Sequence, residues 1–183
     1  MSNVAAIPFN KIDGTSTSLG EFAGSVVLAV NVASKCGLTP QYEGLEKLYE
    51  DFRGKGLVVL GFPANNFKEQ EPGTNDEIVE FCTSTYGVQF PLAEKISVKG
   101  DDIHPLYQQL TSAQPNAVGA GPDNGLLQKL ASIGCAPEKE GDVHWNFEKF
   151  LISKSGEVVG RFAPDIPPQD ERIVSAVEAE LAR

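Results

Sequence analysis

Cysteines are the residues of this sequence best suited to redox or nucleophilic chemistry, and Cys36 has the most informative surroundings. It follows a run of apolar and β-branched residues that ends at Val32, and a helical pattern begins shortly after it. This is the carboxyl end of a buried strand, where open α/β sheets place their sites. The helix start and neighbouring Lys35 favour a thiolate, the reactive form of cysteine. Local context alone also allows a small buried side chain without chemistry.

The remaining cysteines and the histidines exclude several other site types. With Cys82 and Cys135 the chain has an odd number of cysteines, which argues against a disulfide scaffold. No CxxC and no paired Cys/His spacing predicts a zinc site. His104 and His144 stand alone and are interpreted as solvated or structural, so a Cys–His catalytic pair has little support. We therefore predict no metal and no cofactor.

Length and charge narrow the class of protein. A chain of 183 residues can bury one proper core, so residues 1–183 are predicted to form a single domain. The net charge of −10 and the lack of a basic cluster argue against nucleic acid and anionic membrane surfaces as partners. The first thirty residues show no secretory pattern, and the longest apolar run, Val26–Val30, is too short for membrane insertion. A cytoplasmic location is expected.

Apolar patterning predicts strands at both ends of the chain. Apolar residues before Asp13-Gly14 indicate an opening hairpin. Residues 25–32 and 57–62 are typical of strands buried on both faces, and the helical pattern between them implies a parallel crossover. Residues 147–152 and 157–162 are expected to form a second hairpin.

Cap and stop signals predict the helices. Thr39 is expected to cap the first helix, with Pro40 at its first position and Gly54 as its end. A capping box at 74–77 opens a second helix, and two more are expected at 126–133 and 168–181. Residues 112–143 are otherwise rich in Gly, Pro and Asn. The total predicts an α/β fold, a central mixed sheet with helices on both faces.

Four segments resemble the motifs of the glutathione peroxidase family, in the family's order. Residues 31–39 read Asn-Val-Ala-Ser-Lys-Cys-Gly-Leu-Thr and resemble the motif of the peroxidatic cysteine. Residues 61–73 resemble the second motif, residues 145–151 the third, and residues 161–164 the C-terminal signature. The resemblance is strongest to bacterial enzymes with cysteine rather than selenocysteine. It implies a thioredoxin-like fold with an extra N-terminal hairpin.

The resemblance implies a catalytic tetrad of Cys36, Gln70, Trp145 and Asn146. In that chemistry the thiolate attacks the terminal peroxide oxygen. Amide and indole N–H groups resist oxidation and stabilise charge as it moves from sulfur to the leaving oxygen. From residue types alone, Trp145 is more typical of a core residue and Gln70 of an exposed turn residue, and Asn146 could cap or turn the chain.

Cys82 is the candidate for the resolving thiol. Its context, Glu80 to Thr83, resembles that of the resolving cysteine in the thioredoxin-dependent branch of the family. The alternative is a core cysteine on an apolar helix face. Cys135 matches no motif and is interpreted as a free structural or surface thiol.

The sequence thus predicts a hydroperoxide reductase with an antioxidant, stress-response role. Cys36 would become a sulfenic acid, Cys82 would condense with it, and thioredoxin would reduce the disulfide. Glutathione is the alternative reductant. A second hypothesis is a peroxide-sensing relay that passes its disulfide to a partner protein. A purely structural binding module is disfavoured by the intact tetrad. A monomer or dimer is expected.

Overall fold

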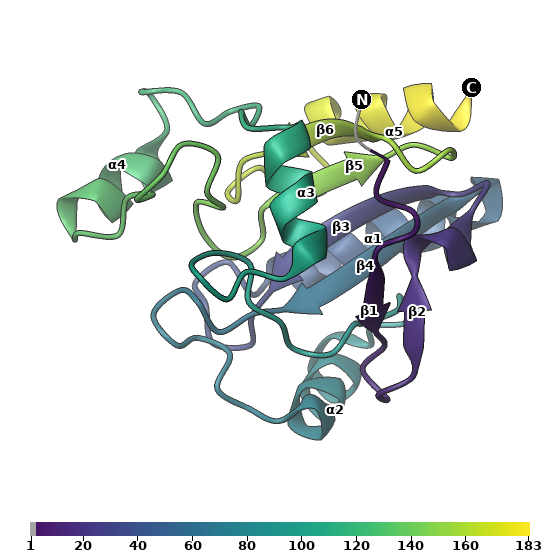
Figure 1. Cartoon of the computed structure of the whole chain (residues 1–183), viewed down its shortest axis with the longest axis horizontal. Helices are drawn as coiled ribbons and strands as arrows, with labels where there is room; N and C mark the ends of the chain where they lie inside the picture. The colour runs from purple at the N-terminus through teal and green to yellow at the C-terminus, as the bar shows by residue number, and fades with distance from the viewer. Residues whose placement is uncertain (1–2) are drawn as a thin grey trace.

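A four-stranded mixed sheet organises the fold, and the computed structural model describes residues 3–183 of the chain (Figure 1). The strand order is β4-β3-β5-β6. Strand β3 (Val26–Val32) pairs in parallel with β4 (Leu57–Pro63), and antiparallel with β5 (Lys149–Ile152). Strand β6 (Val158–Phe162) extends the sheet antiparallel to β5. All seven residues of β3 are buried, as its nearly continuous apolar pattern predicts.

Helices cover the two faces of this sheet. Helix α1 (Gln41–Phe52) lies behind it in Figure 1, whereas α3 (Pro105–Ala113) lies in front. The other helices are α2 (Asn75–Tyr86), α4 (Gly125–Ser132) and α5 (Glu171–Leu181). Strands β1 (Pro8–Asn10) and β2 (Ser16–Ser18) form the predicted N-terminal hairpin, followed by a short 3₁₀ helix, η1 (Leu19–Phe22). The architecture confirms the predicted mixed sheet with an extra hairpin.

Aromatic contacts join the hairpin, the sheet and α3. Phe62 of β4 packs edge-to-face against Phe9 of β1 and Tyr107 of α3, with ring centroids 5.2 and 5.5 Å apart. Tyr107 also contacts Phe150 of β5 at 5.9 Å. Such pairs stabilise beyond their buried area. Helix α3 is therefore part of the core, and the patterning missed it although His104 accepts the Leu106 N–H as its N-cap.

The first helix corrects two boundary predictions. Thr39 does not cap α1, because its hydroxyl is hydrogen-bonded within the loop that carries Cys36. Pro40 occupies the cap position instead, with no side-chain capping bond. Gly54 does not end the helix either. The chain continues into a 3₁₀ turn, η2 (Arg53–Lys55), and Gly56 with φ 105° makes the left-handed stop.

Two further boundaries differ from the prediction because a tertiary or capping contact decides them. Strand β5 begins at Lys149 rather than Phe147, since Phe147 has φ 70° and leaves the strand conformation. Helix α5 begins at Glu171 rather than at 168, because Asp170 is its N-cap and accepts the Arg172 N–H. The capping box of α2 is present as predicted, with Thr74 and Glu77 each accepting the other's backbone N–H.

The segment 112–143 carries α4 away from the sheet, at the left of Figure 1. Val118 and Ile133 are exposed there, and Leu130 turns inward. Within residues 3–183, every helix is too short or too polar to cross a bilayer.

Candidate active site

The predicted site residues come together at one end of the sheet. Strands β3 and β4 are parallel, so the loops that follow them leave from the same edge. Strand β5 is antiparallel to β3, so the residues that precede it reach that edge as well. Cys36 lies on the first loop, Gln70 on the second, and Trp145 and Asn146 on the third.

The Cys36 loop is held by one hydroxyl group. The Cys36 N–H donates to Thr39 Oγ1 at 2.9 Å, and the same hydroxyl donates to the Ala33 carbonyl at 2.8 Å. Cys36 Sγ accepts the Leu38 N–H at 3.3 Å. The Leu38 backbone N–H is thus a hydrogen-bond donor to the sulfur. Cys36 itself is only 9% exposed, so its side chain is largely sheltered from solvent.

A left-handed turn presents Gln70. Lys68 and Glu69 have φ of 57° and 52°, and consecutive non-glycine residues in this region need outside support. The loop receives it from Asn65 Oδ1, which accepts the Glu71 N–H at 2.9 Å, and from Lys95 Nζ, which donates to the Glu71 carbonyl at 3.0 Å. The sequence did not reveal the role of Asn65 and Lys95, because it shows only that these residues are polar.

Gln70 connects the other two loops. Its backbone carbonyl accepts the Lys35 N–H at 3.0 Å, which joins the Gln70 loop to the loop that carries Cys36. Its Oε1 accepts from Asn146 Nδ2 at 2.9 Å, which ties the third loop. With Oε1 occupied in this way, Nε2 is the end of the Gln70 amide left to donate toward a ligand.

Trp145 stands beside this contact. It is 7% exposed, and its ring lies 5.3 Å from that of Phe67, between centroids. Asn146 is fully buried. Of the four predicted catalytic residues, Gln70 and Asn146 therefore touch directly, Cys36 joins them through Lys35, and Trp145 is the chain neighbour of Asn146.

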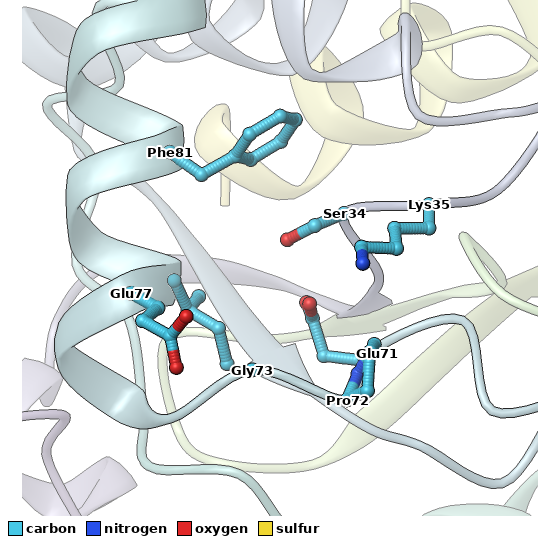
Figure 2. Close-up of a pocket in the computed structure, with 8 residues that line it drawn as sticks. Ser34, Lys35, Glu71, Pro72, Gly73, Glu77 and Phe81 are labelled. Carbon is cyan, nitrogen blue, oxygen red and sulfur yellow. The ribbon is translucent and has the colours of Figure 1, made fainter.

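A cleft of about 370 Å³ opens beside the Cys36 loop (Figure 2). Its lining comes from three segments of the chain: Ser34, Lys35, Glu71, Pro72, Gly73, Glu77, Ile78 and Phe81. Figure 2 shows Ser34 and Lys35 facing Phe81 of α2 across it. Burial raises the pKa of the Glu71 carboxyl group. The cleft thus lies between the loop that carries Cys36 and the helix that carries Cys82.

Cys82 lies on α2 and is not among the residues that line the cleft. It is fully buried on α2 and is a free thiol, as are Cys36 and Cys135. Burial raises the pKa of the Cys82 thiol to about 11, and the neighbouring Glu71 carboxylate also raises it. Phe81, one residue before it, packs against Tyr42 of α1 with centroids 6.4 Å apart. In this structure Cys82 is therefore an inaccessible, protonated thiol.

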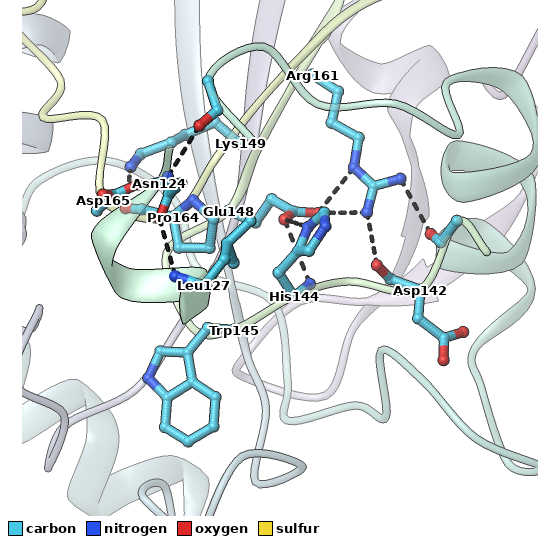
Figure 3. A network of polar contacts seen from close by, with 12 residues as sticks. Asn124, Leu127, Asp142, His144, Trp145, Glu148, Lys149, Arg161, Pro164 and Asp165 are labelled. Carbon is cyan, nitrogen blue, oxygen red and sulfur yellow. Dashed lines mark hydrogen bonds and ion pairs between the residues drawn. The ribbon is translucent and has the colours of Figure 1, made fainter. Parts of the chain in front are cut away.

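A buried ion pair between Arg161 and Glu148 lies next to the third loop (Figure 3). The Arg161 and Glu148 side chains are both fully buried, and Arg161 Nε donates to Glu148 Oε2 at 2.8 Å. Arg161 Nη2 also contacts Glu148 Oε2. Nη1 donates to the backbone carbonyls of Gln114 and Gly141, and Nη2 to that of Asp142. His144 Nδ1 contacts the other Glu148 oxygen, so this histidine is part of the same network. The network joins the ends of segment 112–143 to the loop that presents Trp145.

Comparison with known proteins decides the family. The family model described as glutathione peroxidase matches residues 4–111 of this sequence. The chain belongs to the glutathione peroxidase family. It is 50% identical over 172 residues to the thioredoxin/glutathione peroxidase BtuE of Escherichia coli, a match that covers 94% of this chain and 93% of that protein. It is also 44% identical over 161 residues to the hydroperoxy fatty acid reductase gpx1 of a Synechocystis strain, which covers 88% and 86% of the two chains.

Solved structures agree with this assignment. The crystal structure of Trgpx in its apo form matches with a TM-score of 0.72 and 32% identity, covering 100% of this chain and 98% of that one. A thioredoxin-family thiol:disulfide interchange protein from Chlorobium tepidum matches at a TM-score of 0.57 with 14% identity, which shows the thioredoxin-like fold alone. The chain is thus an enzyme of the glutathione peroxidase type on a thioredoxin-like fold.

Proposed function

We propose that this glutathione peroxidase reduces hydrogen peroxide and organic hydroperoxides through Cys36. The observation that carries the proposal is the 2.9 Å hydrogen bond from Asn146 to the Gln70 side chain. The backbone carbonyl of the same Gln70 accepts the N–H of Lys35, the residue before Cys36. The Cys36 thiolate would attack the terminal peroxide oxygen and break the O–O bond. Cys36 then carries a sulfenic acid, and the leaving alkoxide or hydroxide takes a proton to become alcohol or water.

The neighbouring side chains would stabilise the charge that moves during this step. Asn146 holds Gln70 Oε1, so the Gln70 Nε2 group is oriented before the peroxide arrives. The Trp145 indole N–H, on the residue next to Asn146, would be a second donor. Preorganised donors of this kind lower the barrier because they need no rearrangement as charge develops.

We further propose Cys82 as the resolving thiol. Its sulfur would attack the Cys36 sulfenic acid, so that an S–S bond forms, the S–O bond breaks and water leaves. A disulfide needs the two Cα atoms within about 7 Å, and Cys82 is fully buried on a helix whose Phe81 packs against Tyr42 of α1. Part of α2 must therefore open during each cycle, and the cleft between α2 and residues 34–35 gives it the space.

Thioredoxin is the proposed electron donor. The cleft beside Cys36 contains one lysine and two glutamates, a balance that does not favour an anionic tripeptide such as glutathione. Glutathione stays the alternative, since the E. coli relative is named for both reductants. The name of the Synechocystis relative makes fatty acid hydroperoxides a substrate class to test. The cytoplasmic location and the monomeric or dimeric state stay predictions.

A coupled assay tests the proposal. The reduced protein is given hydrogen peroxide or a fatty acid hydroperoxide, with thioredoxin and its reductase or with glutathione and its reductase. We expect turnover with thioredoxin, none in Cys36→Ser, single-turnover oxidation without recycling in Cys82→Ser, and normal recycling in Cys135→Ser. Peptide mapping of the oxidised protein should find a Cys36–Cys82 disulfide. Peroxide consumption that survives in Cys36→Ser would refute the peroxidatic assignment.

The same assay separates an enzyme from a redox relay. Steady turnover with thioredoxin supports the enzyme. A trapped mixed disulfide between this chain and a client protein, without turnover, would support the relay.

A further inference from the structure

Asn31 is the one polar side chain in an otherwise apolar strand. It is fully buried near the carboxyl end of β3, five positions before Cys36. A buried amide is costly unless it is hydrogen-bonded. Its Nδ2 donates to the Trp145 carbonyl at 3.1 Å, and its own backbone carbonyl accepts the Phe147 N–H at 2.6 Å.

These two contacts bracket Asn146. One bond holds the residue before it and the other holds the residue after it. Strand pairing cannot do this, because the β3–β5 ladder ends at the pair Val30–Lys149. Beyond that pair the chain turns, and Phe147 adopts φ 70°, a left-handed conformation that an aromatic residue keeps only with support from its surroundings.

We propose that Asn31 is a positioning residue for the peroxidatic reaction. It holds the turn 145–147 in the conformation in which the Asn146 amide reaches Gln70. Any residue at position 31 would supply the backbone carbonyl, but only a side chain with a donor of this length reaches the Trp145 carbonyl. Because Asn31 and Cys36 lie on one strand and its following loop, the same contact sets the distance between the sulfur and its donors.

This inference rests on the proposed function, and its test separates the two. Asn31→Leu keeps the branching of the side chain at Cγ but is larger and has no donor, and Asn31→Ser is smaller and too short to reach. Val30→Ala is the matched control, at the adjacent buried position of the same strand. The rate of Cys36 sulfenic acid formation is measured by rapid quench with hydrogen peroxide and mass spectrometry. Melting temperatures are measured alongside.

Both Asn31 variants should oxidise more slowly by a factor on the order of ten or more, as a displaced donor would require. Val30→Ala should oxidise at the wild-type rate even where its melting temperature falls equally. The emission of Trp145, the sole tryptophan, should change in the Asn31 variants and not in Val30→Ala. The rate at which iodoacetamide alkylates Cys36 should change little in the Asn31 variants, because this reaction moves no charge onto a leaving oxygen.

Two outcomes would overturn the inference. Wild-type oxidation rates in folded Asn31→Ser or Asn31→Leu would show that the contact does not position the site. An equal loss of rate in Val30→Ala would show a general effect of stability. A wild-type protein that does not react with peroxide would instead refute the proposed function.

Discussion

Asn146 donates from Nδ2 to Gln70 Oε1 at 2.9 Å, although 76 positions separate the two residues in the chain. Each amide therefore depends on the other for its orientation. Gln70 also sits after two left-handed residues, so its loop has little freedom to compensate for a lost partner. The pair is expected to act as one unit.

Removing either amide should slow the oxidation of Cys36 without unfolding the protein. We expect Gln70→Ala and Asn146→Ala each to lower the second-order rate constant by about 100-fold, the typical effect of losing a preorganised donor. The double variant should be about as slow as the slower single variant, because residues that act as a unit are not additive. Stopped-flow kinetics with hydrogen peroxide checks this. Fully multiplicative losses would contradict the coupling, and unchanged rates would contradict the tetrad.

In the reduced protein Cys82 should resist alkylation. Burial raises the pKa of its thiol to about 11, so at pH 8 it is protonated as well as inaccessible. Iodoacetamide labelling followed by peptide mass analysis should modify Cys36 and the half-buried Cys135 first. After oxidation by peroxide, hydrogen exchange in residues 75–86 should accelerate, since α2 has to open. Fast labelling of Cys82 in the reduced state would show that no opening is needed.

The buried Arg161–Glu148 pair should contribute strongly to stability. Arg161→Met leaves the Glu148 carboxylate without its main partner, and we expect the free energy of unfolding to fall by about 3–5 kcal/mol. The matched control is Arg172→Ala, which breaks the more exposed pair with Asp170 and should lower the free energy of unfolding far less, because solvent screens an exposed pair. Urea denaturation measures both variants. Equal losses would contradict the role assigned to the buried pair.

The same substitution should loosen the long segment. Arg161 holds the carbonyls of Gln114, Gly141 and Asp142, which stand at the two ends of segment 112–143. Limited proteolysis of Arg161→Met should therefore cut within this segment faster than in the wild type. Cutting elsewhere first would argue that the segment is held by other contacts.

Lys149 should make stability depend on pH. Its ammonium group is buried against the Gln41 side chain and the carbonyls of Pro164 and Ile166, and burial lowers its pKa to about 7. The unfolded state has a lysine pKa of about 10.4, so it binds more protons than the folded state above pH 7. The free energy of unfolding should therefore rise from pH 7 to pH 8.5. Urea denaturation of Lys149→Met should lack this rise, and an identical slope in the two proteins would contradict the assignment.

Local sequence determined those parts of the molecule whose cause is local. The apolar run of β3, the hairpin turn at Asp13-Gly14 and the capping box at Thr74 and Glu77 each carry their signal within a few residues. The motif order around Cys36 and Trp145 was enough to predict the family and the thioredoxin-like fold. These features need no knowledge of what lies across the sheet.

Tertiary structure decided the contacts between residues that are distant in the chain. Thr39 looked like a helix cap, but its hydroxyl bonds to the Cys36 loop, because a polar group takes the partner that the folded chain offers. Asn31 looked like one residue of a motif, and its bond to Trp145 spans 114 positions. Whether an amide orients a catalytic donor or only fills a turn depends on such long-range neighbours, and no local pattern of residues encodes them.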